Sequence, residues 1–187
     1  MIDRSMSDSL AGSNFLTFPV VFITMHYQEE TMDIAELIDD LKKGIGLVRV
    51  KAAFALGKLK DKKAEKALID ALSDSNMGVR SNAAFALGEL GSQEAVPRLM
   101  TLLKDHEERV RKSAVKALGM IGANEAVATL IQTLNHDTSQ IVRKSAIRSL
   151  GQLGGPQALQ AVERAASDPD IMLSNMAQKA LEKLKKQ

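Results

Sequence analysis

The residues that could do chemistry in this sequence are few, and they lie far apart along the chain. There is no cysteine among the 187 residues, which excludes disulfides, thiolate metal sites and cysteine nucleophiles. The histidines are His26, His106 and His136, and a site built from the last two would lack a clear third metal ligand. The sequence also has no phosphate-binding glycine loop, nucleophile elbow, dinucleotide-binding fingerprint or HExxH motif. We therefore expect no catalytic residue, no metal site and no cofactor.

The balance of charges narrows the class of partner. Lysine and arginine total 25 and aspartate and glutamate total 23, so the formal net charge is +2. A protein that coats nucleic acid normally carries a strong basic excess, which this chain lacks. The sequence is rich in alanine and leucine and has no tryptophan, a composition that favours helices over a sandwich or barrel.

A repeat with a 31-residue period begins at residue 48. The dipeptide Val-Arg recurs at spacings of 31, 31 and 32 residues, and a Leu-Gly dipeptide and an aspartate keep the same period. The extra residue of the third copy falls beside His136, where a loop is expected. Such self-similarity is typical of a stacked repeat architecture. The copies begin at Val48, Val79, Val110 and Val142.

Each copy is expected to form two helices. Apolar residues recur with a 3.6-residue period over Val79–Leu90, and Gly91 suits the left-handed position that ends a helix. The two later copies also have glycine at this place, Gly122 and Gly154, whereas the first copy has Lys60 instead of a glycine. A second apolar stripe predicts the second helix, from Gln93 to Lys104.

A glycine also recurs inside the first helix of each copy, where it costs about 1 kcal/mol relative to alanine. A cost repeated in every copy implies a repeated benefit, and we expect the backbone of a neighbouring helix to pass close by. Neither helix alone can bury its apolar stripe, so the copies must stack around one shared core. These glycines are Gly57, Gly88, Gly119 and Gly151.

The repeat therefore predicts an all-α protein, a right-handed α-solenoid of helix pairs. The predicted repeat domain covers residues 32–187. It comprises a half-unit at 33–43, four helix pairs at 48–167 and a cap helix at 170–185 that would end the stack with a polar outer side.

The first 31 residues are expected to lie outside this domain. Their apolar stretch, Phe15–Met25, is about half the length of a membrane span. The basic n-region and the small-residue cleavage site of a signal peptide are both lacking. Two interpretations remain open: a poorly ordered leader, or an apolar arm that docks on the solenoid.

The repeat resembles a known family. The pattern Ala-Ala-x-Ala-Leu-Gly-x-Leu-Gly, followed by x-Ala-Val-x-x-Leu-Met-x-x-Leu-x-Asp, is similar to the HEAT-like repeats of the phycobilisome-lyase type over residues 33–185. The resemblance implies an interaction scaffold more often than an enzyme. It also implies that the outer face of the second helices is the binding surface. Bilin lyase subunits and deoxyhypusine hydroxylase contain such repeats too.

The hydroxylase interpretation fails on its metal ligands. The resemblance would place His-Glu pairs directly after the Val-Arg dipeptides to hold a di-iron site. The single His-Glu pair of this chain, His106-Glu107, lies instead in a loop before a Val-Arg. A catalytic role is therefore not expected, and an accessory subunit of an enzyme of the bilin-lyase kind stays the alternative to a non-catalytic scaffold. The positions matching the ligands are Val50-Lys51, Ser81-Asn82, Lys112-Ser113 and Lys144-Ser145.

HEAT repeats also characteristically carry an aspartate and an arginine six residues apart, which form a ladder between units. We interpret the arginines as mainly structural, because buried charges persist when they are paired and hydrogen-bonded. The ladder should fail at both ends, because Lys43 precedes Arg49 and Ser174 follows Asp168. The residues with the required spacing are Asp74, Arg80, Asp105, Arg111, Asp137 and Arg143.

The predicted binding face is the row of second-helix residues opposite the core stripe, which we expect on the concave surface. A protein or peptide partner is expected there, and a merely solvated face is the alternative. Nucleic acid is less favoured because the row has no aromatic residue for base stacking, and no helix combines a basic face with large apolar side chains, as membrane binding would need. The row comprises Lys62, Lys63, Lys66, Asp70, Glu94, Pro97, Arg98, Thr101, Asn124, Glu125, Ala128, Thr129, Gln132, Gln157, Gln160, Ala161 and Arg164.

The first helices depart from the repeat at one position, three residues before the helix glycine. The later copies have Lys116 and Arg148 there, whereas the first two have Phe54 and Phe85, with Val50 one turn before. On a convex face these residues would form an apolar ridge, which usually marks a contact. The leader or a second copy of the chain would cover it, or the rings would fold onto neighbouring helices. We expect a cytoplasmic protein that could form a homo-oligomer.

Overall fold

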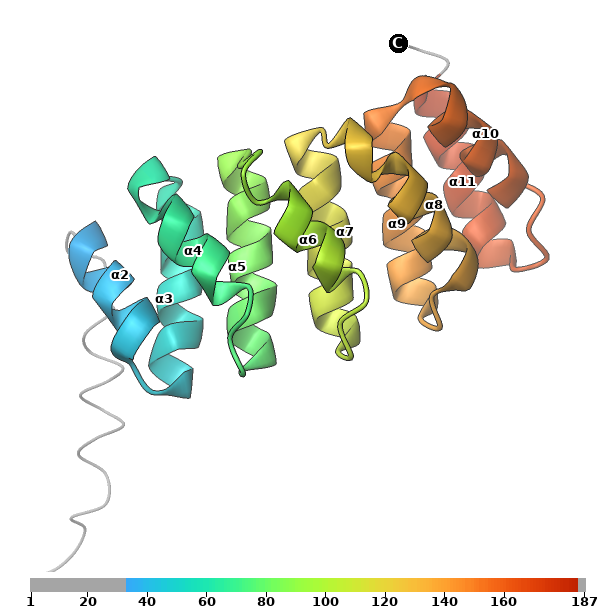
Figure 1. Cartoon of the computed structure of the whole chain (residues 1–187). Coiled ribbons are helices and arrows are strands. Elements are labelled where there is room, and N and C mark those ends of the chain that lie inside the picture. Colours follow the sequence, from blue (N-terminus) through green and yellow to red (C-terminus); the bar gives the residue numbers. More distant parts are fainter. Residues whose placement is uncertain (1–32, 185–187) are drawn as a thin grey trace, which may run out of the picture. The chain divides into compact units, whose positions relative to one another are not determined.

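The computed structural model describes residues 33–184, and within that range it consists of helices with no strand. Successive helices along the chain belong alternately to two layers (Figure 1). The predicted all-α solenoid is confirmed, while the predicted leader at residues 1–31 lies outside the described residues. The second helices are α2 (Ile34–Lys43), α4 (Glu65–Ala71), α6 (Val96–Leu102), α8 (Val127–His136) and α10 (Gly155–Ala165). The first helices are α3 (Gly46–Leu59), α5 (Met77–Leu90), α7 (Glu108–Ile121), α9 (Gln140–Leu153) and α11 (Ile171–Leu184).

Side chains and glycines fix where the first helices begin and end. The Asn76 side chain accepts a hydrogen bond from the backbone N–H of Gly78 at the start of α5, and Ser139 caps α9 in the same way. Gly91 ends α5 at φ +66°, in the left-handed region that glycine adopts without strain. Lys60 ends α3 in that same conformation, at φ 51°, although it carries a side chain. The left-handed helix end therefore recurs in the first copy, where a residue other than glycine adopts it.

The second helices are shorter than the apolar stripe suggests. The predicted helix Gln93–Lys104 contains an α-helix only at Val96–Leu102, with Pro97 in its first turn. At both ends of this helix, hydrogen bonds between residues three apart, as in a 3₁₀ helix, replace the α-helical ones. One example is the bond that the N–H of Leu103 donates to the carbonyl of Met100, at 3.3 Å. Short 3₁₀ helices, Lys62–Ala64 and Asn124–Ala126, likewise precede α4 and α8.

The helix glycines allow successive first helices to approach closely. A Cβ atom added to Gly88 would lie 2.8 Å from the Cα of Ala117 on the next first helix, a distance that real Cβ atoms do not adopt. At Gly57 the added atom would lie 2.9 Å from the Cβ of Ala86. The predicted benefit of these glycines is therefore confirmed. The leucines beside them are fully buried and join the units into one core: Leu56, Leu87, Leu118 and Leu150.

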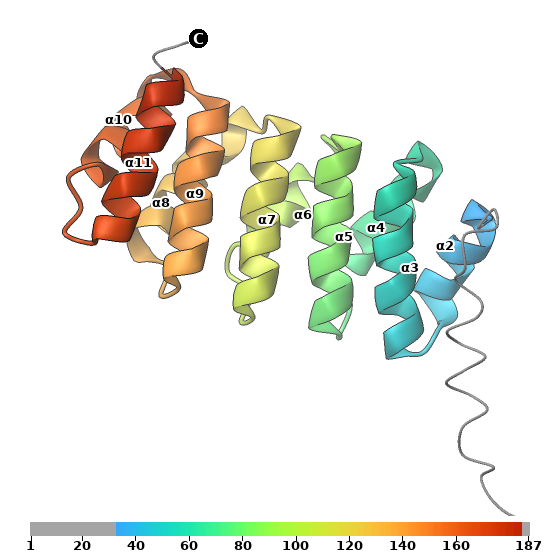
Figure 2. The same cartoon turned by 180° about the vertical axis from the view of Figure 1, so that it is seen from behind.

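The two layers differ in how their helices contact one another. Successive first helices pack directly side by side, as Figure 2 shows from behind, whereas neighbouring second helices make few contacts with each other. Each second helix packs mainly on first helices. The first layer is thus the continuous part of the stack, and the outer sides of the second helices are left free. No helix within residues 33–184 is long and apolar enough to cross a membrane.

Candidate interaction surface

The predicted row on the second helices is accessible in the structure. We call it the second-helix face. Its residues are exposed, apart from Thr129, which is half-buried, and Ala161, which is buried at 8% exposure. The assignment of Ala161 to this face is therefore wrong, because its methyl group belongs to the core side of α10. The exposed members are Lys62, Lys63, Lys66, Asp70, Glu94, Pro97, Arg98, Thr101, Asn124, Glu125, Ala128, Gln132, Gln157, Gln160 and Arg164.

The second-helix face is hollowed where neighbouring second helices stand apart. Between α8 and the segment that follows α6 lies a hollow of about 560 Å³, whose lining includes Thr129 and Gln132 of the row. Two histidines line the same hollow: His106, in the loop before α7, and His136, the last residue of α8 rather than the loop residue expected. We call it the histidine hollow. A smaller hollow of about 130 Å³ between α8 and α10 includes Arg164. The row is therefore a surface with two depressions.

The histidine hollow brings together the residues considered for a metal site. His106 and His136 are exposed side chains, and the hollow also contains the ladder carboxylates Asp105 and Asp137. Within residues 33–184, however, no three histidine, cysteine, aspartate or glutamate side chains are grouped closely enough to hold a metal ion. Asp137 is engaged by an arginine at 2.8 Å. The histidine hollow is therefore a polar depression lined by imidazole and carboxylate groups.

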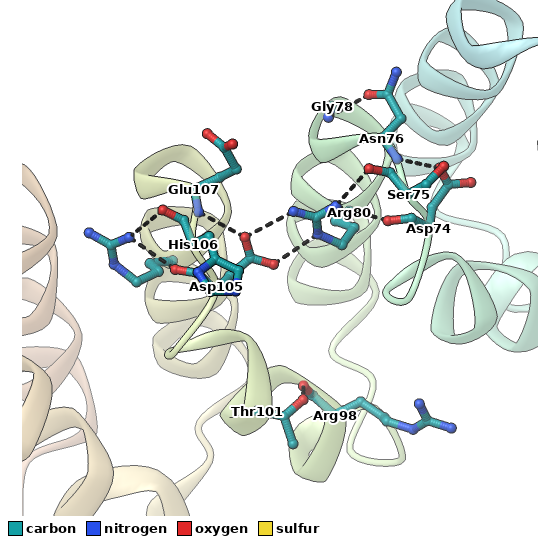
Figure 3. A network of polar contacts seen from close by, with 11 residues as sticks. Asp74, Ser75, Asn76, Gly78, Arg80, Arg98, Thr101, Asp105, His106 and Glu107 are labelled. Atoms are coloured by element: carbon teal, nitrogen blue, oxygen red, sulfur yellow. Dashed lines mark hydrogen bonds and ion pairs between the residues drawn. The ribbon is translucent and has the colours of Figure 1, made fainter.

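Arginine side chains join each unit to the next through paired hydrogen bonds. The Nε and Nη2 atoms of Arg80 donate to the two carboxylate oxygens of Asp105 at 2.8 and 2.9 Å (Figure 3). The third nitrogen, Nη1, donates to the backbone carbonyls of Asp74 and Ser75 in its own unit. Arg111 repeats this geometry with Asp137, at 2.8 and 3.0 Å. Such two-point pairs fix geometry as well as charge.

The ladder does not fail at the ends of the stack, so that expectation is wrong. Each arginine pairs with the aspartate of the following unit rather than with the one six residues before it. Arg49 therefore reaches Asp74 at 2.7 Å, and Arg143 reaches Asp168 at 3.2 Å. Only the last pair is looser, because the Nε of Arg143 donates to the carbonyl of Leu134 instead.

Opposing effects act on the ladder carboxylates. Burial raises the pKa of Asp74, but hydrogen bonds from Arg49 and from the backbone N–H of Asn76 lower it, and the net result is a pKa below the usual value. The pKa of Asp105 is lowered in the same way, by Arg80 and the backbone N–H of Glu107 against burial. These carboxylates stay ionised and paired, so their arginines are engaged within the fold.

The first helices carry the aromatic departure from the repeat. The side chains of Phe54 and Phe85 remain 52% and 42% exposed and line one hollow of about 240 Å³ between α3 and α5, which we call the aromatic hollow. The Nζ of Lys58 lies 4.9 Å from the centre of the Phe54 ring. Val50 is half-buried and packs towards Gly78 of α5. The two rings therefore share a depression and are not folded away.

Helix pairs stacked in two layers and joined by an Arg–Asp ladder define an α-solenoid of helical repeats. The chain belongs to the HEAT-repeat family, since HEAT repeats match residues 34–97, 78–151 and 127–187. The resemblance to HEAT-like repeats of the phycobilisome-lyase type is confirmed by this match and by the similarity to a lyase structure described next. No curated protein matches the chain.

Solved structures support the same fold. The complex of CpcE and CpcF of phycocyanin lyase from Nostoc sp. PCC7120 is 27% identical with a TM-score of 0.74, over 86% of this chain and 68% of that chain. An engineered protein is 25% identical with a TM-score of 0.58, over 82% and 79% of the two chains. A designed armadillo repeat protein in complex with the peptide (KR)4 is 22% identical with a TM-score of 0.61, over 81% of each chain.

The hollows were not found from the sequence. Each is lined by residues of two or more elements, and the spacing within one repeat does not show how far two second helices stand apart. The exposed row could be found because helical periodicity places its members opposite the buried stripe.

Proposed function

We propose that this protein is a non-catalytic scaffold that binds another protein or a peptide through the second-helix face. The observation that carries the proposal is the combination of an exposed polar row with the histidine hollow set into it. A hollow of about 560 Å³ can accept side chains of a partner, while the row offers charges and amides along the whole stack. Its mixed chemistry suits a polypeptide with side chains of both signs.

The proposal assigns no catalytic role to any residue. The buried cations of the ladder are held by carboxylates and backbone carbonyls, and their geometry serves to join units. Within the described residues, the exposed histidines are not grouped with a third metal-ligating side chain closely enough to hold a metal ion. We place the protein in the cytoplasm, as expected from the sequence, and cell fractionation tests this part of the proposal.

An accessory subunit of a lyase-like enzyme is the second candidate. It is favoured by the similarity to the structure of the complex of CpcE and CpcF of phycocyanin lyase. A partner of this kind would be another repeat protein, and the assembled pair would handle a chromophore. Visible absorbance of the protein purified with its partner distinguishes the candidates, since the scaffold proposal requires a colourless complex.

Affinity capture with a charge-changed variant tests the scaffold proposal. The variant carries Lys66→Glu, Arg98→Glu, Gln132→Arg and Arg164→Glu, which alter the second-helix face and leave the ladder intact. We expect wild type to retain a partner in the native lysate that the variant loses. A matched control carries Lys116→Glu, Arg148→Glu and Lys179→Glu on the first helices and should retain the same partner. A partner held equally by all three proteins would rule out the second-helix face.

A further inference from the structure

One position of the first helices changes its chemistry halfway along the stack. It lies six residues after the valine of each Val-Arg dipeptide, or after Leu173 in the cap helix. Because first helices pack side by side, equivalent positions form one row across them (Figure 2). The row begins with two aromatic residues and continues with cations. In order, its members are Phe54, Phe85, Lys116, Arg148 and Lys179.

Two hollows of the same construction lie at the two ends of this row. The aromatic hollow lies between α3 and α5, with Gly57 in its lining. A hollow of about 560 Å³ between α9 and α11, which we call the cationic hollow, contains the equivalent Gly151. The same repeat position therefore lines both depressions. The cationic hollow is lined by Arg148, Lys179 and Lys183, with Glu182 as the carboxylate beside them.

Unlike the arginines of the ladder, the cations of this row form no ion pair within the part of the chain that the structure describes. Within residues 33–184, no carboxylate lies within ion-pair distance of Lys116, Arg148 or Lys179. Lys112 and Lys144, one turn before Lys116 and Arg148, also lack an ion pair in that part of the chain. Three neighbouring helices thus present a positive field, although the whole chain has a net charge of only +2.

We propose that this first-helix face is a second binding surface, for an acidic polypeptide segment that carries a large apolar anchor. The anchor would enter the aromatic hollow, and the acidic residues would lie over α7, α9 and α11. The surface is separate from the second-helix face, and the proposal does not rest on the function proposed above.

The separation of aromatic and cationic groups favours a polypeptide over nucleic acid. Each nucleotide carries both a base and a phosphate, so grooves for single strands combine aromatic residues and cations along their length. Here the aromatic residues lie at one end and the unpaired cations at the other. A polypeptide can carry its apolar and acidic residues in separate stretches.

The distance between the hollows sets the length of the segment. Three helix-to-helix steps separate them, and packed helices lie about 9 Å apart, so the span is about 27 Å. An extended chain covers this with about 8 residues, and a helix with about 18 residues. A short linear segment is therefore sufficient.

Fluorescence anisotropy with synthetic peptides tests the proposal. The probe has two phenylalanines, a flexible glycine-serine spacer of about 8 residues and four glutamates, and is made in both orders. Matched probes replace phenylalanine by serine or glutamate by lysine, and oligothymidine serves as the nucleic-acid probe. We expect the acidic aromatic peptide to bind most tightly, with weaker binding at high salt.

Variants locate the binding. Lys116→Glu, Arg148→Glu and Lys179→Glu together should weaken binding of the probe at least about tenfold, because attraction becomes repulsion. Phe54→Ser with Phe85→Ser should weaken it too, while circular dichroism checks that each variant is folded. The second-helix variant should bind like wild type, which separates this proposal from the one above. Equal binding of the lysine peptide, unchanged binding by the triple variant, or tighter binding of oligothymidine would each overturn it.

Discussion

The two helix layers of this solenoid differ in how uniform their helix lengths are. Within residues 33–184, each of the first helices α3, α5, α7, α9 and α11 has 14 residues. The second helices vary from 7 residues in α4 and α6 to 10 in α8 and 11 in α10. The extra residue of the third repeat falls at the end of α8, in the second layer. Helix length is therefore more tightly constrained in the first layer, whose helices contact one another.

The contacts explain this difference. A first helix must match two neighbours at its glycine, at its buried leucine and at its ladder arginine, so its length and register cannot change independently. A second helix packs mainly on first helices and makes few contacts with its own kind. Its outer side is free to carry the residues that a partner requires. The comparison predicts that substitutions in the first layer cost far more stability than substitutions in the second.

The largest effect is expected from a central ladder arginine. Arg111→Ala would leave the carboxylate of Asp137, whose side chain is only 5% exposed, without its cation. We expect the free energy of unfolding to fall by about 3 kcal/mol, as for other broken buried pairs. Urea unfolding followed by circular dichroism measures the change. Arg98→Ala on the second-helix face, the matched control, should change it by less than about 0.5 kcal/mol.

The next largest effect is expected at a helix glycine. The added methyl group of Gly88→Ala would meet the backbone of Ala117 at 2.8 Å, so α5 and α7 would have to separate. The gain in helix propensity offsets part of that cost, and a net loss of about 2 kcal/mol is expected. In Gly151→Ala the nearest atom is a side-chain methyl at 3.2 Å on the terminal helix α11, so no loss is expected. Equal losses in the two variants would show that close approach does not set the cost.

Acid should weaken the first layer through its carboxylates. The pKa values of Asp74 and Asp105 lie below their usual value of 3.8 in the folded protein. A lowered pKa stabilises the fold above the unfolded-state value, and that contribution is lost as the pH falls through the lower folded-state value. Stability should therefore decline below about pH 4. Asp105→Asn should show a lower stability at neutral pH and a shallower decline in acid, measured by thermal unfolding across this range.

Much of the first layer could be predicted from the sequence, because its contacts recur with the repeat. The spacing of Gly57 and Gly88 indicated a close approach that the structure contains. The resemblance implied a ladder between units, but the end pairs were missed, because the spacing of Asp74 and Arg80 within one unit does not show which neighbouring unit supplies each partner. Only the stacked structure brings those partners within reach.

The candidate site was predictable in part. Periodicity placed the row on exposed positions except at Ala161, which is buried with Ala158, Val162 and Ala165 on the core side of α10, and at the half-buried Thr129. The hollows depend on the gaps between helices, which no spacing within a repeat reveals. The same holds for Phe54 and Phe85, since their exposure depends on how the helix of the next unit passes beside them.

A smaller effect is expected at the end of α3. Lys60 adopts a left-handed backbone at φ 51°, which glycine would adopt without strain. Lys60→Gly should raise the free energy of unfolding by about 0.5 kcal/mol, although it removes an exposed ion pair with Glu89. The reverse change in the next unit, Gly91→Lys at φ +66°, should lower it by about 1 kcal/mol. Thermal unfolding of the two variants would contradict this account if both changes had the same sign.

The smallest effect on stability is expected where the proposed function is most sensitive. Lys66, Arg98, Gln132 and Arg164 are exposed, and the hydrogen bond of Arg98 to Ser73 at 3.3 Å is the one that the structure records for these four side chains within residues 33–184. Changing all four, as in the binding variant, should therefore alter the free energy of unfolding by less than about 1 kcal/mol in total. Chemical unfolding of this variant beside Arg111→Ala measures the contrast between the layers directly. A loss as large as that of Arg111→Ala would mean that the second helices stabilise the stack through their outer sides. The hypothesis that the first layer provides the stability and the second layer the binding residues would then be wrong.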